Sequence, residues 1–104
     1  MVLSLELTLV NRYQLMRSLT KENKNLTVPW YIMAAYAYYV QDNPLLTDYA
    51  FDNLAKTMIK HWPEITHRHK YFITLDELRA GTLLRRDFPS IIPGAVEKVR
   101  QIKQ

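Results

Sequence analysis

The residues best placed to do chemistry in this sequence are two aspartates, Asp48 and Asp52, which flank Phe51 and follow the tyrosine pair Tyr38-Tyr39. On a helix that begins near Asp48, the two carboxylates lie one turn apart on one face, where like charges are mutually unfavourable. Asp48 recovers that cost because an acid in the first turn interacts favourably with the helix dipole. Asp52 lies beyond the strongest part of this field. A small local loss of helix stability beside aromatic side chains is typical of a functional surface.

Two predicted helices must position these residues. Residues 29–41 are apolar on nearly all sides, so we expect this segment to be the central, most buried helix of the fold. Thr27 is its expected cap, and Pro29 lies in its first turn, where a missing backbone N–H costs nothing. Residues 42–46, which include Pro44, are predicted to form a tight connection to the next helix.

The second of these helices is predicted to begin at Thr47 or Asp48, either of which can cap it, and to end near His61, before Pro63. Its apolar residues recur at the spacing of one helical face. This spacing predicts the stripe that packs on the core, which consists of Phe51, Leu54, Ala55, Met58 and Trp62.

The N-terminal segment is ambiguous by pattern alone. Residues 2–10 alternate apolar and polar side chains, which is typical of a strand, yet Leu3 and Leu7 also fit one helical stripe. Because a lone strand needs a partner, we favour a helix over most of residues 4–19. A polar loop over residues 20–25 is expected to follow it.

The C-terminal third carries clear start and stop signals. Residues 71–73 are predicted to be a short extended piece. Residues 74–77, Thr-Leu-Asp-Glu, match a capping box, which opens a short helix that Gly81 either ends or weakens. A Pro/Ser turn is expected over residues 87–92. The last helix is predicted over residues 93–103, and its apolar face consists of Val96, Val99 and Ile102.

These elements predict an all-α fold, in which residues 1–104 form one domain built as a small bundle of four or five helices around a central helical hairpin. The composition, 48% apolar and 23% charged, is typical of a globular protein. The sequence contains no cysteine, which excludes a disulfide scaffold, thiol catalysis and cysteine-ligated zinc.

The stretch that contains the aspartates also matches the motif of a known family. Residues 38–54 read Tyr-Tyr-x-x-Asp-x-Pro-x-x-x-Asp-x-x-Phe-Asp-x-Leu. This pattern resembles the N-terminal Ia subdomain of bacterial NAD-dependent DNA ligases, which reads Tyr-His-x-x-Asp-x-Pro-x-x-x-Asp-x-x-Tyr-Asp-x-Leu. The family follows its second helix with a His-Pro-Glu-Leu turn, and residues 61–65 of this chain read His-Trp-Pro-Glu-Ile. The resemblance covers residues 29–66, with no gap before Trp62.

In those ligases the Ia subdomain is a helical cap that holds the nicotinamide mononucleotide half of NAD and closes over the adenylation domain. The resemblance therefore implies a cap-like hairpin over residues 29–66 and assigns nucleotide contacts to Tyr38, Asp48 and Asp52. An aromatic face can stack on nicotinamide, whose positive ring also attracts carboxylates. Carboxylates can in addition accept hydrogen bonds from ribose hydroxyls or from a carboxamide.

Two family positions differ, since Tyr39 stands where the family has histidine and Phe51 stands where it has its second tyrosine. Ligase activity is not expected. Adenylation requires a lysine in a Lys-x-Asp-Gly context within a much larger domain, and neither Gly81 nor Gly94 lies in such a context. We therefore expect that the chain is not an enzyme.

The chain has a net charge of +4, and its bases are unevenly distributed. From residue 79 onward the acids are Asp87 and Glu97, whereas the bases are Arg79, Arg85, Arg86, Lys98, Arg100 and Lys103. Such an end is either a solvated helix face or a surface for a polyanion or an acidic protein. A zinc site at His61, His67 and His69 is not expected, because no cysteine or suitably spaced acid completes the ligand set.

Three hypotheses of function follow, all of them binding functions. The leading one is a non-catalytic, stand-alone relative of the ligase cap that acts on a macromolecular partner, a protein, in DNA metabolism. A phage or mobile element would carry such a domain as a host-directed modulator. The second is a sensor of nicotinamide mononucleotide or NAD through Tyr38, Asp48 and Asp52. The third is a nucleic-acid-binding module that uses the basic helices of residues 74–104 and binds in a salt-sensitive way.

We expect a cytoplasmic protein without a membrane partner. The long uncharged run over residues 26–41 is short for a bilayer span. The N-terminus has no basic region and carries Glu6, so a signal peptide is not expected.

Overall fold

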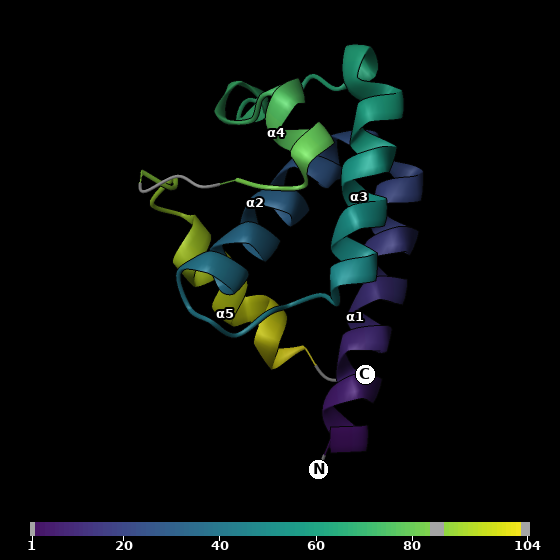
Figure 1. Ribbon diagram of the computed structural model, residues 1–104, viewed down its shortest axis with the longest axis vertical. Coiled ribbons are helices and arrows are strands. Elements are labelled where there is room, and N and C mark those ends of the chain that lie inside the picture. Colours follow the sequence, from purple (N-terminus) through teal and green to yellow (C-terminus); the bar gives the residue numbers. More distant parts are fainter. Residues whose placement is uncertain (1, 84–86, 103–104) are drawn as a thin grey trace.

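The computed structural model describes residues 2–83 and 87–102, and all of the regular secondary structure in these ranges is helical (Figure 1). The prediction of a small all-α bundle is confirmed. The α-helices are α1 (Val2–Glu22), α2 (Thr27–Tyr39), α3 (Asp48–His61), α4 (Leu75–Ala80) and α5 (Ile92–Gln101). The 3-10 helices are η1 (Lys24–Leu26), η2 (Trp62–Glu64) and η3 (Lys70–Phe72).

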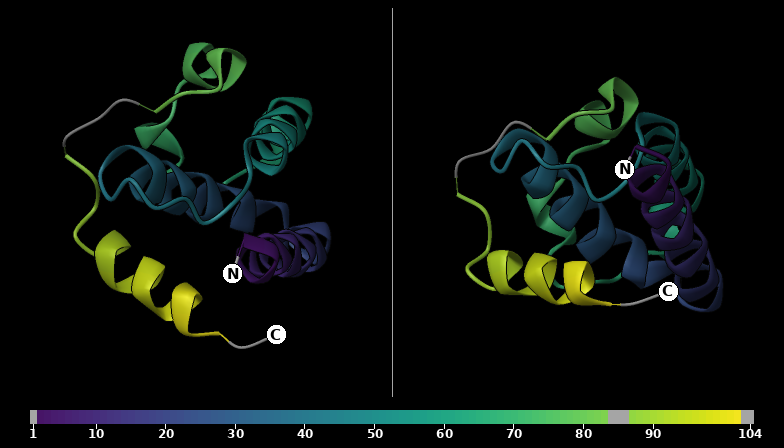
Figure 2. Two further views of the ribbon diagram at one scale, coloured as in Figure 1. Left: turned by 60° about the horizontal axis from the view of Figure 1, so that its bottom comes forward. Right: turned by 90° about the horizontal axis from the view of Figure 1, so that it is seen from below.

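Helix α2 is the centre of the bundle, as its sequence predicts. It packs against both α3 and α5, and nine of its thirteen residues are buried because they are apolar on nearly every side. Tyr31 is fully buried, and its hydroxyl donates a hydrogen bond to the Thr82 carbonyl at 2.8 Å. The views in Figure 2 place α4 and α5 on opposite sides of α2.

The connection from α2 to α3 is tight, as predicted. Asp42 adopts a left-handed conformation with φ of 50°, which aspartate tolerates better than most residues. The N–H of Asn43 donates back to the Ala37 carbonyl at 2.9 Å. Leu45 and Leu46 then enter the core, so the chain arrives at α3 with a fixed direction.

Helix α3 begins as the sequence predicts. The Thr47 hydroxyl caps it by accepting a hydrogen bond from the Ala50 N–H at 3.1 Å. The predicted stripe faces the core, with Leu54, Ala55 and Met58 buried. Phe51 and Trp62 are half-buried and pack against the same core.

The predicted boundary between α1 and α2 is wrong in two respects. Helix α1 includes Glu22, so the expected loop over residues 20–25 is reduced to a short link in which the Asn23 side chain caps η1. Thr27 is not the cap of α2. Because η1 leads directly into α2, Thr27 already has a helical conformation, and its hydroxyl donates to the Lys24 carbonyl at 2.6 Å.

The extended piece expected at residues 71–73 is also wrong, since η3 occupies most of it. Phe72 and Ile73 are both buried, whereas Tyr71 is exposed. Successive side chains of a strand point to opposite faces. A strand would therefore not bury two adjacent residues against one core as readily as the end of a 3-10 turn does. The Lys70 ammonium holds this turn to η2 through the Trp62 carbonyl at 2.8 Å.

The last two α-helices follow their predicted signals. The capping box at Thr74 and Glu77 is present, and Gly81 ends α4 in a left-handed conformation with φ of 69°. Helix α5 begins at Ile92, with Pro93 in its first turn, and ends at Gln101. Ile102 is extended and 46% exposed, so its predicted place on the apolar face is wrong, and Lys103 lies outside the described residues.

Candidate functional site

A pocket lies where the end of α2 meets the beginning of α3, and we refer to it as the α2–α3 pocket. Its volume is about 210 Å³. Tyr38 and Tyr39 line it from the last turn of α2, and Asp48 and Asp52 line it from the first two turns of α3. The other lining residues are Ala34, Leu46, Phe51, Ala80 and Gly81, so α4 closes one side.

The two carboxylates of the α2–α3 pocket have different surroundings. Asp48 is the first residue of α3, where an acidic side chain interacts favourably with the helix dipole. The Asp52 carboxylate forms an ion pair with the Lys56 ammonium at 3.0 Å, and both side chains are more than half exposed. An exposed pair of this kind contributes little stability, so Asp52 can exchange Lys56 for another cation at low cost.

The tyrosines supply an exposed aromatic surface beside these carboxylates. The rings of Tyr38 and Tyr39 meet edge to face with centroids 4.9 Å apart, and they are 47% and 38% exposed. Burial raises the pKa of the Tyr39 hydroxyl, and the charges of Tyr38 and Asp48 raise it further. Tyr39 therefore keeps its hydroxyl proton to a higher pH than a free tyrosine does, and it stands at the position where the ligase family has histidine.

Phe51 belongs to the pocket wall and to the core at once. Its ring stacks on Tyr31 with centroids 4.7 Å apart and an interplanar angle of 17°. Burial is the main cause of a strongly raised pKa of Tyr31. The ring of Phe51 is thus held in place from behind by a neutral, fully buried tyrosine that is itself anchored to the Thr82 carbonyl.

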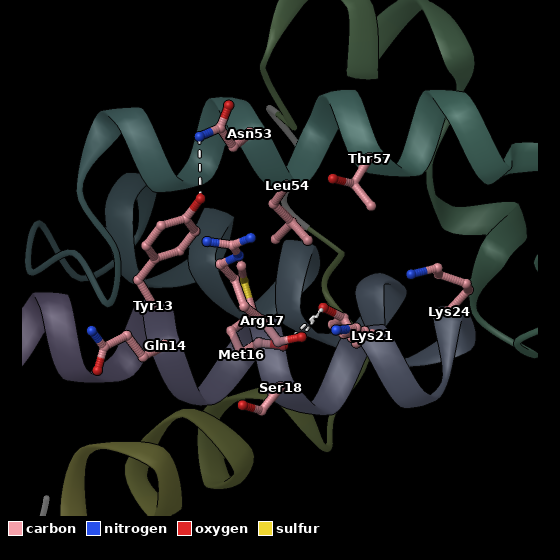
Figure 3. Close-up of a pocket in the computed structure, with 11 residues that line it drawn as sticks. Tyr13, Gln14, Met16, Arg17, Ser18, Lys21, Lys24, Asn53, Leu54 and Thr57 are labelled. Carbon is pink, nitrogen blue, oxygen red and sulfur yellow. Dashed lines mark hydrogen bonds between the residues drawn. The ribbon is translucent and has the colours of Figure 1, made fainter.

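A second pocket, which the sequence analysis missed, lies between α1 and α3, and we refer to it as the α1–α3 pocket (Figure 3). Its volume is about 460 Å³. One wall carries the bases Arg17, Lys21 and Lys24. The sequence does contain a signal for this pocket. Arg17 and Lys21 are spaced at i, i+4 in α1, where two like charges repel one another.

The predicted basic residues are spread over the molecule. Arg79 lies on α4 and contacts Asp76 at 3.5 Å, whereas Lys98 and Arg100 lie on α5, on the other side of α2 (Figure 2). Arg100 donates to the Gln41 side chain at 2.6 Å and to the Asn43 carbonyl at 2.5 Å. The remaining predicted bases, Arg85, Arg86 and Lys103, lie outside the described residues.

The histidines are held by local contacts. His61 contacts the Glu64 carboxylate at 2.7 Å. His67 accepts a hydrogen bond from the His69 N–H at 3.0 Å, and burial, with the charges of His69 and Arg68, lowers its pKa. Within residues 8–83 and 87–102, no three side chains of the types that bind metal ions are grouped closely enough to form a site.

The described helices include none with the length and apolarity needed to cross a membrane. Comparisons with protein-family models, with curated proteins and with solved structures find no match to this chain. Its function must therefore be inferred from the two pockets and from the side chains that line them.

Proposed function

We propose that this chain is a non-catalytic binding domain whose α2–α3 pocket takes a cationic aromatic ring of the nicotinamide type. One observation carries the proposal. Tyr38, Asp48 and Asp52, to which the ligase resemblance assigns nucleotide contacts, come from two helices and line the same pocket.

The chemistry of the lining matches such a ring. Tyr38 presents an exposed aromatic face on which a flat ring can stack, and Asp48 and Asp52 supply negative charge for a pyridinium nitrogen. The Tyr39 hydroxyl, held in its protonated form, can donate to a carboxamide oxygen. Each contact uses a group that the surrounding fold leaves at least partly exposed.

The volume of the α2–α3 pocket limits the size of the ligand. Its 210 Å³ is below the roughly 300–1,000 Å³ of sites that enclose drug-sized ligands. One ring and its sugar fit this volume better than a whole dinucleotide does. We therefore expect nicotinamide riboside and nicotinamide mononucleotide to bind, and the adenylate half of NAD to add little.

Calorimetric titration of the purified chain tests the proposal. Nicotinamide riboside, which lacks a phosphate, and nicotinamide mononucleotide should both bind saturably. Asp48→Asn and Asp52→Asn should each weaken both ligands by roughly fivefold, because each removes one charge near the ring. Glu97→Gln, which removes an exposed carboxylate of α5, is the matched control and should leave both affinities unchanged.

Two results would contradict this assignment. One is that the riboside fails to bind at millimolar concentration. The other is binding that survives the double Asp48→Asn, Asp52→Asn variant. The phosphate-free ligand matters here, because a response limited to the mononucleotide would locate the interaction at a cationic site elsewhere in the molecule.

A macromolecular partner in DNA metabolism is the second candidate function. It is supported by consecutive exposed side chains at the end of α2, where Tyr38, Tyr39 and Val40 are each more than a third exposed. Tyr38 and Tyr39 also line the α2–α3 pocket, and Val40 follows them directly at the end of the helix. Capture of a protein from native lysate by the tagged chain, and its loss with Val40→Ser, would support it, whereas equal capture by both would contradict it.

A further inference from the structure

The α1–α3 pocket shares no lining residue with the α2–α3 pocket. Asp48 and Asp52 lie on one side of α3, while Asn53 and Thr57 lie on another and face α1. Figure 3 shows Arg17, Lys21 and Lys24 along one side of the α1–α3 pocket and the α3 residues across from them. The two helices therefore form facing walls of an open cavity.

The charge of the α1–α3 pocket is one-sided. Arg17, Lys21 and Lys24 line it, and its lining contains no aspartate or glutamate. Among the described residues, no carboxylate is within ion-pair distance of these three bases. Lys21 lies in the last turn of α1, where the helix dipole favours a base, whereas the two bases at i, i+4 repel one another slightly. A cleft lined by one sign of charge concentrates ligands of the opposite sign.

The rest of the lining defines what else the ligand needs. Leu54 and Met16 form an apolar floor, both of them buried in the core. Tyr13 closes one end, because its hydroxyl is bonded to the Asn53 amide at 3.2 Å across the gap between α1 and α3. The Arg17 guanidinium lies 5.7 Å from the centre of the Tyr13 ring, a cation–π contact at the same end of the pocket.

We propose that the α1–α3 pocket binds a small organic phosphate. The phosphate group contacts Arg17, Lys21 and Lys24, and the organic body lies against Leu54 and the Tyr13 ring. Cations of this kind form the strong, charge-assisted hydrogen bonds that phosphate oxygens accept. The volume of about 460 Å³ is within the range of small-molecule sites, which favours a discrete ligand over a nucleic-acid strand.

The test uses phenyl phosphate as probe, with phenol as its uncharged analogue and inorganic phosphate as the headgroup alone. Binding to the isotope-labelled chain is followed by NMR at constant ionic strength. Phenyl phosphate should bind saturably and shift the amides of residues 13–24 and 53–57. It should bind more tightly than inorganic phosphate, because of its apolar body, and phenol should produce no saturable shift.

Charge-neutral variants locate the site. Lys21→Gln and Lys24→Gln should each weaken phenyl phosphate by roughly three- to tenfold, and the double variant should abolish measurable binding. Lys60→Gln is the matched control, since Lys60 is an exposed lysine of α3 outside the pocket. All these side chains are at the surface or partly so, and an unchanged melting temperature will show that the variants remain folded.

Three outcomes would overturn the proposal. The first is no saturable binding of phenyl phosphate at millimolar concentration. The second is binding that the double Lys21→Gln, Lys24→Gln variant retains. The third is that a single-stranded oligonucleotide shifts the same amides while phenyl phosphate does not, which would make this face a nucleic-acid surface. None of these outcomes depends on whether nicotinamide riboside binds, because the riboside carries no phosphate.

Discussion

The ring of Phe51 stacks on the ring of Tyr31 at 4.7 Å, and this contact joins α3 to α2 behind the α2–α3 pocket. Phe51 is half-buried, so its truncation removes both apolar contact and one wall of the pocket. We expect Phe51→Ala to lower the free energy of unfolding by about 2 kcal/mol, less than the ~3–5 kcal/mol of a fully buried phenylalanine. Urea denaturation measures this loss, and Phe51→Tyr, which keeps the ring, should cost little.

Phe51 and Tyr39 are also the two positions at which the chain departs from the ligase motif. If the pocket takes a nicotinamide ring, then Phe51→Tyr restores the hydroxyl that the family carries at this position, and the Tyr39 hydroxyl is kept as a donor. We expect the affinity for nicotinamide riboside to increase, since sites that hydrogen-bond their ligands discriminate strongly against missing partners. Calorimetry would show the increase, and a decrease would mean that the pocket has been shaped for another ligand.

Thr47 controls the first turn of α3 and with it the position of Asp48. Thr47→Ala removes the hydroxyl that accepts from the Ala50 N–H, and the expected loss of stability is about 1 kcal/mol. Thr47→Ser keeps the acceptor and should be close to the parent protein. Thermal unfolding separates the two variants, and equal melting temperatures would contradict the capping role.

Arg100 has a structural role that the other described C-terminal bases do not share. It reaches from α5 to the α2–α3 connection and donates to Gln41 and to Asn43. Arg100→Gln should lower the unfolding free energy by about 1–2 kcal/mol, because these donors carry charge and are only partly buried. Lys98→Gln, on the same helix and exposed, should change it by less than about 0.5 kcal/mol.

His67 makes stability depend on pH on the acid side of neutrality. Its folded-state pKa is lowered by burial, and its Nδ1 must stay unprotonated to accept from the His69 N–H. The unfolded chain takes up a proton near the ordinary pKa of about 6.5, before the folded chain does. Its contribution is therefore fully present above that pH and is lost as the pH falls through the folded-state pKa. His67→Asn should flatten this part of the stability curve in urea titrations between about pH 7 and pH 5.

Local signals account for much of the fold. Thr47, the capping box at Thr74 and the stop at Gly81 act within one turn of chain, so the residues themselves predict them. The cap assigned to Thr27 fails for a related reason. A threonine before an apolar helix looks the same whether it precedes the first turn or lies inside it, and only the preceding 3-10 turn decides.

The two pockets differ in how far the sequence reveals them. Tyr38, Asp48 and Asp52 are close in sequence and belong to one motif, so a reader of the chain can group them. The α1–α3 pocket requires Tyr13 and Asn53 to meet, and these residues are 40 positions apart. Such a meeting depends on how the whole of α1 lies against the bundle, which short-range patterns do not encode.

Helix α3 forms part of both pockets, with acids facing one and uncharged polar groups facing the other. A ligand that moves this helix along or about its axis, even slightly, changes the shape of the site on the opposite side. Thermodynamic linkage then requires the effect to be reciprocal, so that each ligand alters the affinity of the other by one and the same factor. If α3 did not move, that factor would be one, and the two ligands would bind without cooperativity.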